Sequence, residues 1–220
     1  DNAFNHWMTQ SWGGPNMQGN NYFWGYFRNE LEYGIAAYNE STAAVNFINS
    51  ALSARWPAFL TYALSSSGLG GVLPEGQQYG AYMLDYPIVP FTTAALYGRD
   101  LYTETNFYKE ALINLIYNTT LAPTFAKGGS TPFYQLFAYN DTDFLYSAAS
   151  NAGLGNAMTE YANRWNNLPV GQYARQWLNT VKPSVGLHEQ SVDSGGAALN
   201  FNSLPLDYYA PGLKYLYAKN

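Results

Sequence analysis

The chain has 220 residues, enough for one sizeable hydrophobic core, and 47% of them are hydrophobic, which excludes a disordered protein. Charged residues make up only 11% and the net charge is −5, which argues against nucleic acid because phosphate binding needs a basic stripe. Aromatic residues reach 18%, and their mixture of apolar area and polar groups suits sugar-binding clefts, protein interfaces and close-packed assemblies alike.

Neither a membrane span nor a metal or other cofactor is predicted. No apolar run approaches the length that crosses a bilayer. The chain lacks cysteine, and its two histidines, His6 and His188, are 182 residues apart. Asp141 and Asp143 lack the glycine and glutamate of a calcium loop.

In the N-terminal third, the sequence predicts an irregular segment at the start of the chain followed by a helical hairpin. Residues 1–19 are rich in Asn, Gly and Trp, and apolar residues then recur at helical spacing over residues 22–38. Ser41 offers an N-cap for a second helix, which Pro57 is expected to kink. The two helices are expected to lie antiparallel.

The middle of the chain predicts a break and then more helices. Gly residues interrupt the chain at 68–71, and Gly and Pro predict a turn-rich connection at 73–82, the kind of loop that often carries function. Helical periodicity and capping residues predict further helices at residues 86–97, 106–118, 132–149, 152–165 and 170–181.

The pattern changes after residue 183. Residues 214–219 alternate with a period of two, as in a β-strand. We therefore divide the chain into a helical region, 1–183, and a loop with the start of a β-sheet, 184–220. The predicted fold is mainly α, built of antiparallel helical hairpins with a short β segment at the C-terminal end.

Two short segments share a pattern with one enzyme group. The first is Asn20-Asn21-Tyr22, and the second is Pro74-Glu75-Gly76-Gln77-Gln78-Tyr79, whose last residue lies 57 positions after Tyr22. Together they resemble catalytic elements of the polysaccharide lyases with an (α/α) toroid, the alginate lyase and heparinase II/III-like families. In those families an Asn-Asn-His segment opens one helix and a Glu-Gly-x-x-Tyr-like segment opens a later one. Here Tyr22 stands at the position of the His.

The resemblance implies a fold and a setting. The family has an (α/α) toroid followed by a β-sandwich domain, and the predicted helices are too few for a closed toroid of hairpins. We therefore expect a partial toroid in a fragment of a longer protein, with a β-sandwich domain or a homo-oligomer partner completing it. A secreted, periplasmic or cell-surface location is expected, with an acidic polysaccharide as the partner.

The resemblance also implies a reaction. Lyases of this group cleave uronic-acid polysaccharides by β-elimination: a base removes the proton beside the carboxylate, and the leaving glycosidic oxygen receives a proton. The dianionic intermediate needs hydrogen-bond donors or a cation. By this resemblance Asn20 or Asn21 binds the carboxylate, and Tyr79 is the base or the acid. The role of the family's His is left open among Tyr22, His6, His188 and no residue at all.

Further residues in and near the two segments are expected to take part in substrate binding. Glu75 is expected either at a subsite or behind the residues that touch the substrate, and Gln78 is expected to bind substrate. Arg28 lies two helical turns after Asn21, on nearly the same face, and is expected to bind substrate and to lower the pKa of Tyr79.

Each of these residues also has a structural interpretation. Asn20 and Asn21 are favourable caps for the helix that begins beside them. Arg28 is placed to pair with Glu32 four residues later. Tyr79 is one of 21 tyrosines and has an alternative role in packing.

Two other functions compete with the lyase. A toroid glycoside hydrolase needs two carboxylates that flank the scissile bond. The available acids are Glu30, Glu75, Asp85 and Asp100. The other alternative is a non-enzymatic sugar-binding or self-assembling surface protein, favoured by the tyrosine-rich, charge-poor composition and by the absence of the family's His.

Overall fold

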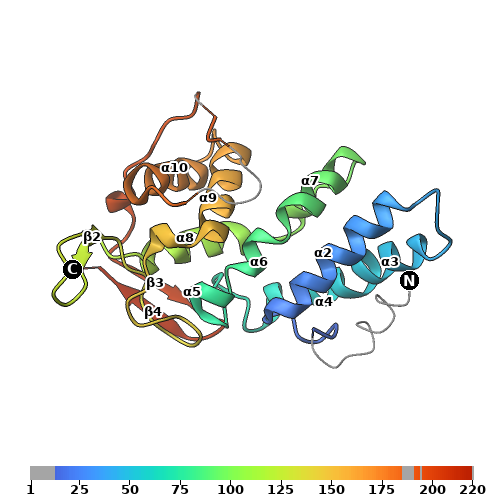
Figure 1. Ribbon diagram of the computed structural model, residues 1–220, viewed down its shortest axis with the longest axis horizontal. Helices are drawn as coiled ribbons and strands as arrows, with labels where there is room; N and C mark the ends of the chain where they lie inside the picture. Colours follow the sequence, from blue (N-terminus) through green and yellow to red (C-terminus); the bar gives the residue numbers. More distant parts are fainter. Residues whose placement is uncertain (1–12, 185–190, 194, 220) are drawn as a thin grey trace.

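A computed structural model describes residues 13–184, 191–193 and 195–219, and it is mainly helical (Figure 1). His6, His188 and most of the irregular segment expected at the start of the chain lie outside these residues. The α-helices are α2 (Asn21–Ala36), α3 (Ala44–Asn49), α4 (Trp56–Ser65), α5 (Gly76–Tyr79), α6 (Tyr82–Asp85), α7 (Ile88–Leu96), α8 (Phe107–Asn118), α9 (Ala152–Arg164) and α10 (Pro169–Val181). Two antiparallel two-stranded sheets pair β1 (Thr124–Phe125) with β2 (Pro132–Phe133) and β3 (Asp207–Ala210) with β4 (Tyr215–Ala218).

The helices form two groups joined by a middle segment (Figure 1). Helices α2 to α4 lie at one end of the molecule, and α8 to α10 lie at the other with the two small sheets. The short helices α5 and α6 cross between the groups, and α6 packs against both α2 and α9. Among the described residues, every helix is too short or too polar to cross a membrane.

The predicted hairpin at the N-terminal end is present. Helix α2 begins after Asn20, whose side chain accepts a hydrogen bond from the backbone N–H of Tyr22 at 2.8 Å. The returning helix is irregular, because a π-helical segment, Ser50–Arg55, separates α3 from α4. Pro57 is the second residue of α4, just after this segment, and a proline without an N–H is a common cause of such an irregularity.

A buried ion pair ties the π-helical segment to α2. Glu30 is fully buried, and both of its carboxylate oxygens accept from Arg55 Nε, at 3.1 and 3.0 Å. Arg55 also donates to the backbone carbonyl of Gly13. Burial raises the pKa of Glu30, and the Arg55 charge opposes that shift. The pair therefore depends on both partners, since either charge alone would be stranded in the core.

One continuous core contains many of the large aromatic side chains. It runs from α2 to α10, and its rings meet edge to face, as Trp24 does with Phe59 at 4.7 Å and Phe91 with Tyr102 at 4.8 Å. Three fully buried tyrosines at its centre have hydroxyls without a hydrogen-bond partner, and burial raises their pKa values well above the usual range: Tyr102, Tyr108 and Tyr161. These aromatic side chains are therefore core residues, whereas others, such as Tyr79 and Tyr82, are exposed.

The prediction of a helix at residues 132–149 is wrong. This segment contains the short strand β2, irregular chain and a single 3-10 turn, Ala148–Ser150. Asn140 adopts a left-handed backbone conformation with φ of 49°, which ends any helix there. The residues that follow it form hydrogen bonds with the distant turn at 73–78, so their polar groups are satisfied without a helix.

The expected strand near the C-terminus is confirmed. Strand β4 pairs with β3, and both strands pack on α8. The Tyr208 hydroxyl donates to the Gly70 carbonyl at 2.9 Å, and its ring stacks on Tyr117 at 5.2 Å. These contacts join the hairpin to the helical part of the chain.

We predict that Arg55→Met destabilises the protein by about 3–5 kcal/mol, because it leaves the Glu30 carboxylate buried without its cation. Urea unfolding followed by circular dichroism measures the loss. Arg28→Met is the matched control, since it breaks the partly exposed Arg28–Glu32 pair, which is worth about 0.5 kcal/mol or less. The double variant Glu30→Leu/Arg55→Met should recover most of the loss, and equal losses in the two single Arg variants would contradict the assignment.

Candidate functional site

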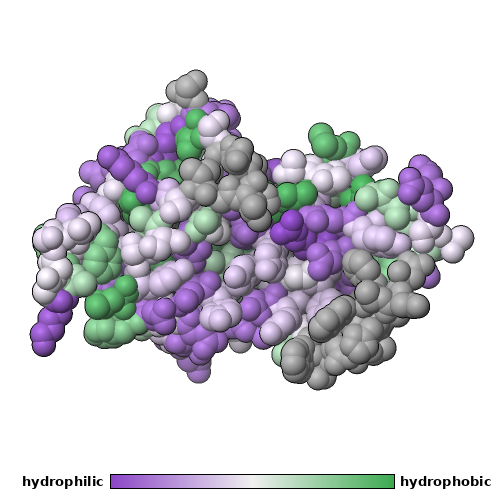
Figure 2. Space-filling view, in the orientation of Figure 1, coloured by the Kyte–Doolittle hydropathy of each residue, from purple (hydrophilic) through white to green (hydrophobic). Residues whose placement is uncertain are grey.

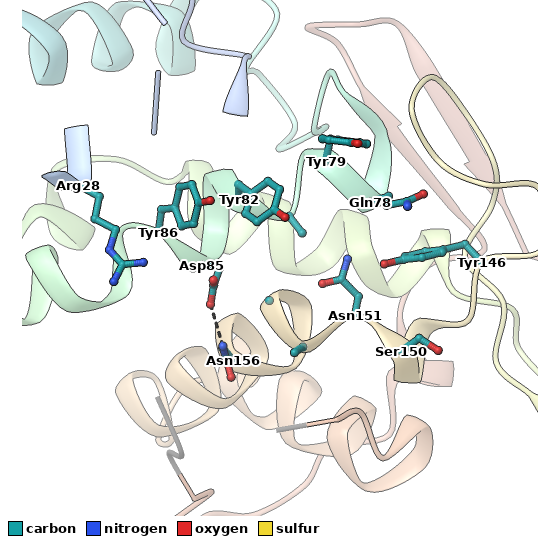
Figure 3. Close-up of a pocket in the computed structure, with 13 residues that line it drawn as sticks. Arg28, Gln78, Tyr79, Tyr82, Asp85, Tyr86, Tyr146, Ser150, Asn151 and Asn156 are labelled. Atoms are coloured by element: carbon teal, nitrogen blue, oxygen red, sulfur yellow. Dashed lines mark hydrogen bonds between the residues drawn. The ribbon is translucent and has the colours of Figure 1, made fainter. Parts of the chain in front are cut away.

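A pocket of about 620 Å³ lies where α2, the α5–α6 segment and the start of α9 meet (Figure 3). This volume is within the usual range for small-ligand pockets. Its lining is polar and aromatic. The principal side chains are Arg28, Gln78, Tyr79, Tyr82, Asp85, Tyr86, Tyr146, Asn151 and Asn156.

A glycine turn positions the α5 wall of the pocket. Gly76 has a φ of +75°, which side chains rarely adopt, and a Cβ at this position would overlap Thr142 Oγ1 and the Tyr139 carbonyl oxygen. The chain can therefore pass beneath the loop at 139–143 only because residue 76 has no side chain. Helix α5 starts at this turn and carries Gln78 and Tyr79 to the pocket.

Hydrogen bonds fix the loop at residues 139–143 onto the turn at 73–78. They come from both backbone and side-chain groups, so the two segments are joined along their length. The donor and acceptor pairs are Gln77 N to Thr142 Oγ1 (2.7 Å), Tyr139 O–H to the Leu73 carbonyl (3.2 Å), Asp143 N to Gln78 Oε1 (3.2 Å) and Asn140 Nδ2 to the Pro74 carbonyl. The contact with Asp143 orients the Gln78 amide at the edge of the pocket (Figure 3).

Three tyrosines form one wall. Tyr79, Tyr82 and Tyr86 are separated by three and four residues, which places their side chains on one side of the α5–α6 segment (Figure 3). Tyr82 stacks on Tyr86 with ring centroids 4.7 Å apart, and Tyr79 meets Tyr82 edge to face at 6.4 Å. Tyr79 remains 48% exposed, so its hydroxyl is accessible from solvent.

Arg28 reaches this wall from α2. Its guanidinium carbon lies 5.6 Å from the centroid of the Tyr86 ring, within the range of a cation–π contact. Burial raises the pKa of Tyr86, the neighbouring Tyr82 adds to that rise, and Arg28 opposes it. The helical spacing predicts that Arg28 acts on Tyr79, whereas the geometry places its charge beside Tyr86. The expected Arg28–Glu32 pair is also present, at 2.9 Å.

The start of α9 forms the opposite wall. Asn151 caps this helix, accepting from the Leu154 N–H at 3.1 Å, and donates to the Gln77 carbonyl at 3.1 Å. Asn156 Nδ2 donates to Asp85 Oδ1 at 2.8 Å, so α9 is also joined to α6 (Figure 3). These two hydrogen bonds hold the walls at a fixed separation.

Tyr146 completes the pocket from the loop before α9. Figure 3 places its hydroxyl toward Asn151, across the pocket from Tyr79. Burial raises the pKa of Tyr146, and a hydrogen bond with the Asn151 side chain opposes the rise. The hydroxyl therefore keeps its proton at neutral pH.

The structure brings together three of the seven site residues proposed from the sequence. Arg28, Gln78 and Tyr79 line the pocket. The residues that lie outside its lining are Asn20, Asn21, Tyr22 and Glu75. The expectation that the side chains of Asn21 and Tyr79 face one pocket therefore differs from the observed geometry.

The residues outside the lining form a structural cap. Asn20 Nδ2 donates to Glu75 Oε1 at 2.6 Å, and the Asn21 backbone N–H donates to Glu75 Oε2 at 2.7 Å. Burial raises the pKa of Glu75, and the Asn21 hydrogen bond opposes the rise. A carboxylate at the positive end of a helix is stabilising, so Glu75 fastens the start of α2 to the turn before α5. Tyr22 is 51% exposed beside this cap.

The candidate acids of a hydrolase are mostly engaged elsewhere. Asp85 lines the pocket, whereas Glu30 pairs with Arg55 and Glu75 caps α2. Asp100 pairs with Arg164 at 3.1 Å. Within the part of the chain that the structure describes, no group of three or more His, Cys, Asp or Glu side chains could hold a metal ion.

We predict that Gly76→Ala destabilises the protein by about 1–3 kcal/mol more than Gly98→Ala does, because the added methyl collides with the loop at 139–143. Gly98 is the matched control. Its φ is +88°, but a Cβ there meets nothing within 4 Å, so only the backbone strain of roughly 1–2 kcal/mol applies. Thermal unfolding of both variants measures the difference, and similar losses would show that the loop contact is unimportant.

Comparison with known proteins adds no constraint. The chain matches no protein-family model, and neither a curated protein nor a solved structure is significantly similar to it. The function of this protein is therefore inferred from the geometry of the pocket and from the residues that line it.

Proposed function

We propose that the pocket binds a uronic-acid-containing polysaccharide and that the protein is a lyase that cleaves it by β-elimination, with Tyr79 as an acid/base residue. One observation carries the proposal. The second of the two lyase-like segments supplies Gln78 and Tyr79 to one pocket, and the helix that begins at the first segment supplies Arg28 to the same pocket.

The reaction needs two proton transfers, and the pocket holds two suitable hydroxyls. A base takes the proton from C5 of the uronate, the C4–C5 double bond forms, and the C4–O bond breaks while an acid protonates the leaving oxygen. In this proposal Tyr146, which keeps its proton, protonates the leaving oxygen, and Tyr79, on the opposite side of the pocket, acts in its ionised form as the base. Tyr146 thereby takes the role of the family's His, for which the sequence offers Tyr22, His6, His188 or no residue at all.

In this proposal two groups of the pocket, Gln78 and Arg28, stabilise the carboxylate of the substrate. Gln78 Oε1 accepts from the Asp143 N–H, which leaves the amide Nε2 as a donor to substrate. Arg28 adds a cation at the other end of the tyrosine wall. Fixed donors of this kind stabilise developing negative charge because they need no reorganisation during the reaction.

The architecture is also part of the proposal. We infer that the helical hairpins belong to a partial (α/α) toroid, and that a secreted, periplasmic or cell-surface location follows from a polymeric substrate. An apolar groove of about 410 Å³ between α2, α3 and α7 supports an incomplete helical assembly. At the tip of α7, Leu96 and Tyr97 are 82% and 78% exposed, and Figure 2 shows apolar surface there.

The two alternatives differ in their support. A glycoside hydrolase needs paired carboxylates, and Asp85 is the one carboxylate among the described lining residues. A non-enzymatic sugar-binding protein has a specific observation in its favour, because Asn20 and Glu75 are engaged in capping α2. Its polar and aromatic pocket would then bind sugar without cleaving it.

We predict that Tyr79→Phe lowers turnover about a hundredfold or more, because it removes the hydroxyl that transfers the proton. The assay follows the ultraviolet absorbance of unsaturated products from alginate, hyaluronan, heparan sulfate and pectate. Stability should change little, since the side chain is 48% exposed. Tyr209→Phe, at an exposed tyrosine of β3 outside the pocket, is the matched control and should retain activity.

The outcomes separate the proposed functions. Full activity in Tyr79→Phe would remove Tyr79 from the mechanism. If the unmodified protein makes no unsaturated product from any of the four polymers but binds one of them, the non-enzymatic function replaces the lyase. Reducing ends produced without ultraviolet absorbance would instead identify a hydrolase.

A further inference from the structure

The charges of the pocket are mixed. Among the described lining residues, Arg28 is the one cationic side chain and Asp85 the one carboxylate. Arg28 is also paired with Glu32 at 2.9 Å, which reduces the positive field that it contributes. The pocket therefore differs from the strongly basic site that a uniformly charged polyanion would require.

Asp85 is held in place at the pocket wall. It is the last residue of α6, and its Oδ1 accepts from Asn156 Nδ2 at 2.8 Å. Helix α9 comes close at this point, because a Cβ on Gly153 would lie only 3.3 Å from Asp85 Cβ. The carboxylate thus has a fixed position in the pocket, next to Tyr86 and the start of α9 (Figure 3).

A fixed carboxylate discriminates between sugars by charge. It repels a uronate carboxylate placed beside it, and this repulsion is strongest where solvent is partly excluded. It accepts hydrogen bonds from the hydroxyl groups of an uncharged sugar, and such charge-assisted bonds are stronger than neutral ones. The volume of about 620 Å³ is larger than one sugar ring, so neighbouring sugars of a polymer enter together.

We propose that Asp85 and Asn156 form a subsite for an uncharged sugar, next to the site that receives the uronate near Gln78 and Tyr79. This inference rests on the proposed lyase function. It makes Asp85 a specificity-determining residue, which selects polymers in which a uronate alternates with a neutral sugar. Homopolymers of uronate are disfavoured because they place a carboxylate at every position.

The test compares two classes of polymer. The unmodified protein should cleave hyaluronan or unsulfated heparosan with a kcat/KM at least tenfold above that for polygalacturonate or alginate. Asp85→Asn removes the charge and keeps an oxygen that accepts from Asn156. It should lower the activity on the alternating polymers, raise the activity on the homopolymers, and so change the ratio at least tenfold.

Two controls isolate the charge at the subsite. Glu40→Gln removes an exposed negative charge outside the pocket lining and should leave the ratio unchanged. If Asp85→Asn fails to fold, the salt dependence of the unmodified protein tests the same point. Its preference for the alternating polymers should weaken as salt rises, because salt screens the repulsion between carboxylates.

The failures are distinguishable. A preference of the unmodified protein for homopolymers, an equal effect of Asp85→Asn on both polymer classes, or a ratio independent of salt would overturn the subsite while leaving the lyase function intact. A protein that makes no unsaturated product from either class would overturn the lyase function, and the subsite with it.

Discussion

The pocket depends on the contact between the turn at 73–78 and the loop at 139–143. Gly76 allows the two segments to approach, and the hydrogen bond from the Gln77 N–H to Thr142 Oγ1 fixes their separation. Because α5 follows this turn directly, the same contact sets the positions of Gln78 and Tyr79. Asn151 then links the turn to α9 through the Gln77 carbonyl. A single buried junction therefore determines where both walls of the pocket stand.

Tyrosine serves two purposes in this fold, and burial separates them. Tyrosines such as Tyr108 and Tyr161 lie in the core, where burial raises their pKa values so far that they act as neutral aromatic rings. Tyr79, Tyr82 and Tyr146 line the pocket, where their hydroxyl groups can meet a ligand. A composition rich in tyrosine is consistent with a sugar site and with a dense core, and this protein contains a dense core together with a tyrosine-lined pocket.

The two segments that resemble lyase elements meet in space, but their residues divide between structure and site. Asn20 and Glu75 join the start of α2 to the turn before α5, so the two segments hold each other in register. Tyr79, at the end of the second segment, and Arg28, on the helix that begins at the first, reach the pocket. The capping contact thus supports the site without lining it. For the proposed lyase function, the mixed charge of the pocket fits a substrate that carries isolated carboxylates, in a protein of net charge −5.

The sequence by itself determined the elements whose apolar pattern is local. Helices α2, α8, α9 and α10 and strand β4 were predictable because each element satisfies its own periodicity and ends at its own capping or turn residues. Among the pocket residues, Gln78 and Tyr79 followed from a short motif, and Arg28 followed from its helical spacing after Asn21. The spacing of Tyr79, Tyr82 and Tyr86 was a further signal, from which Tyr82 and Tyr86 could have been added to the predicted site. Only the tertiary structure decided the course of residues 132–149 and the places of Tyr146, Asn151 and Asn156. Asn151 and Asn156 have hydrogen-bond partners on segments some 70 residues away in the chain, and local propensity carries no information about such partners.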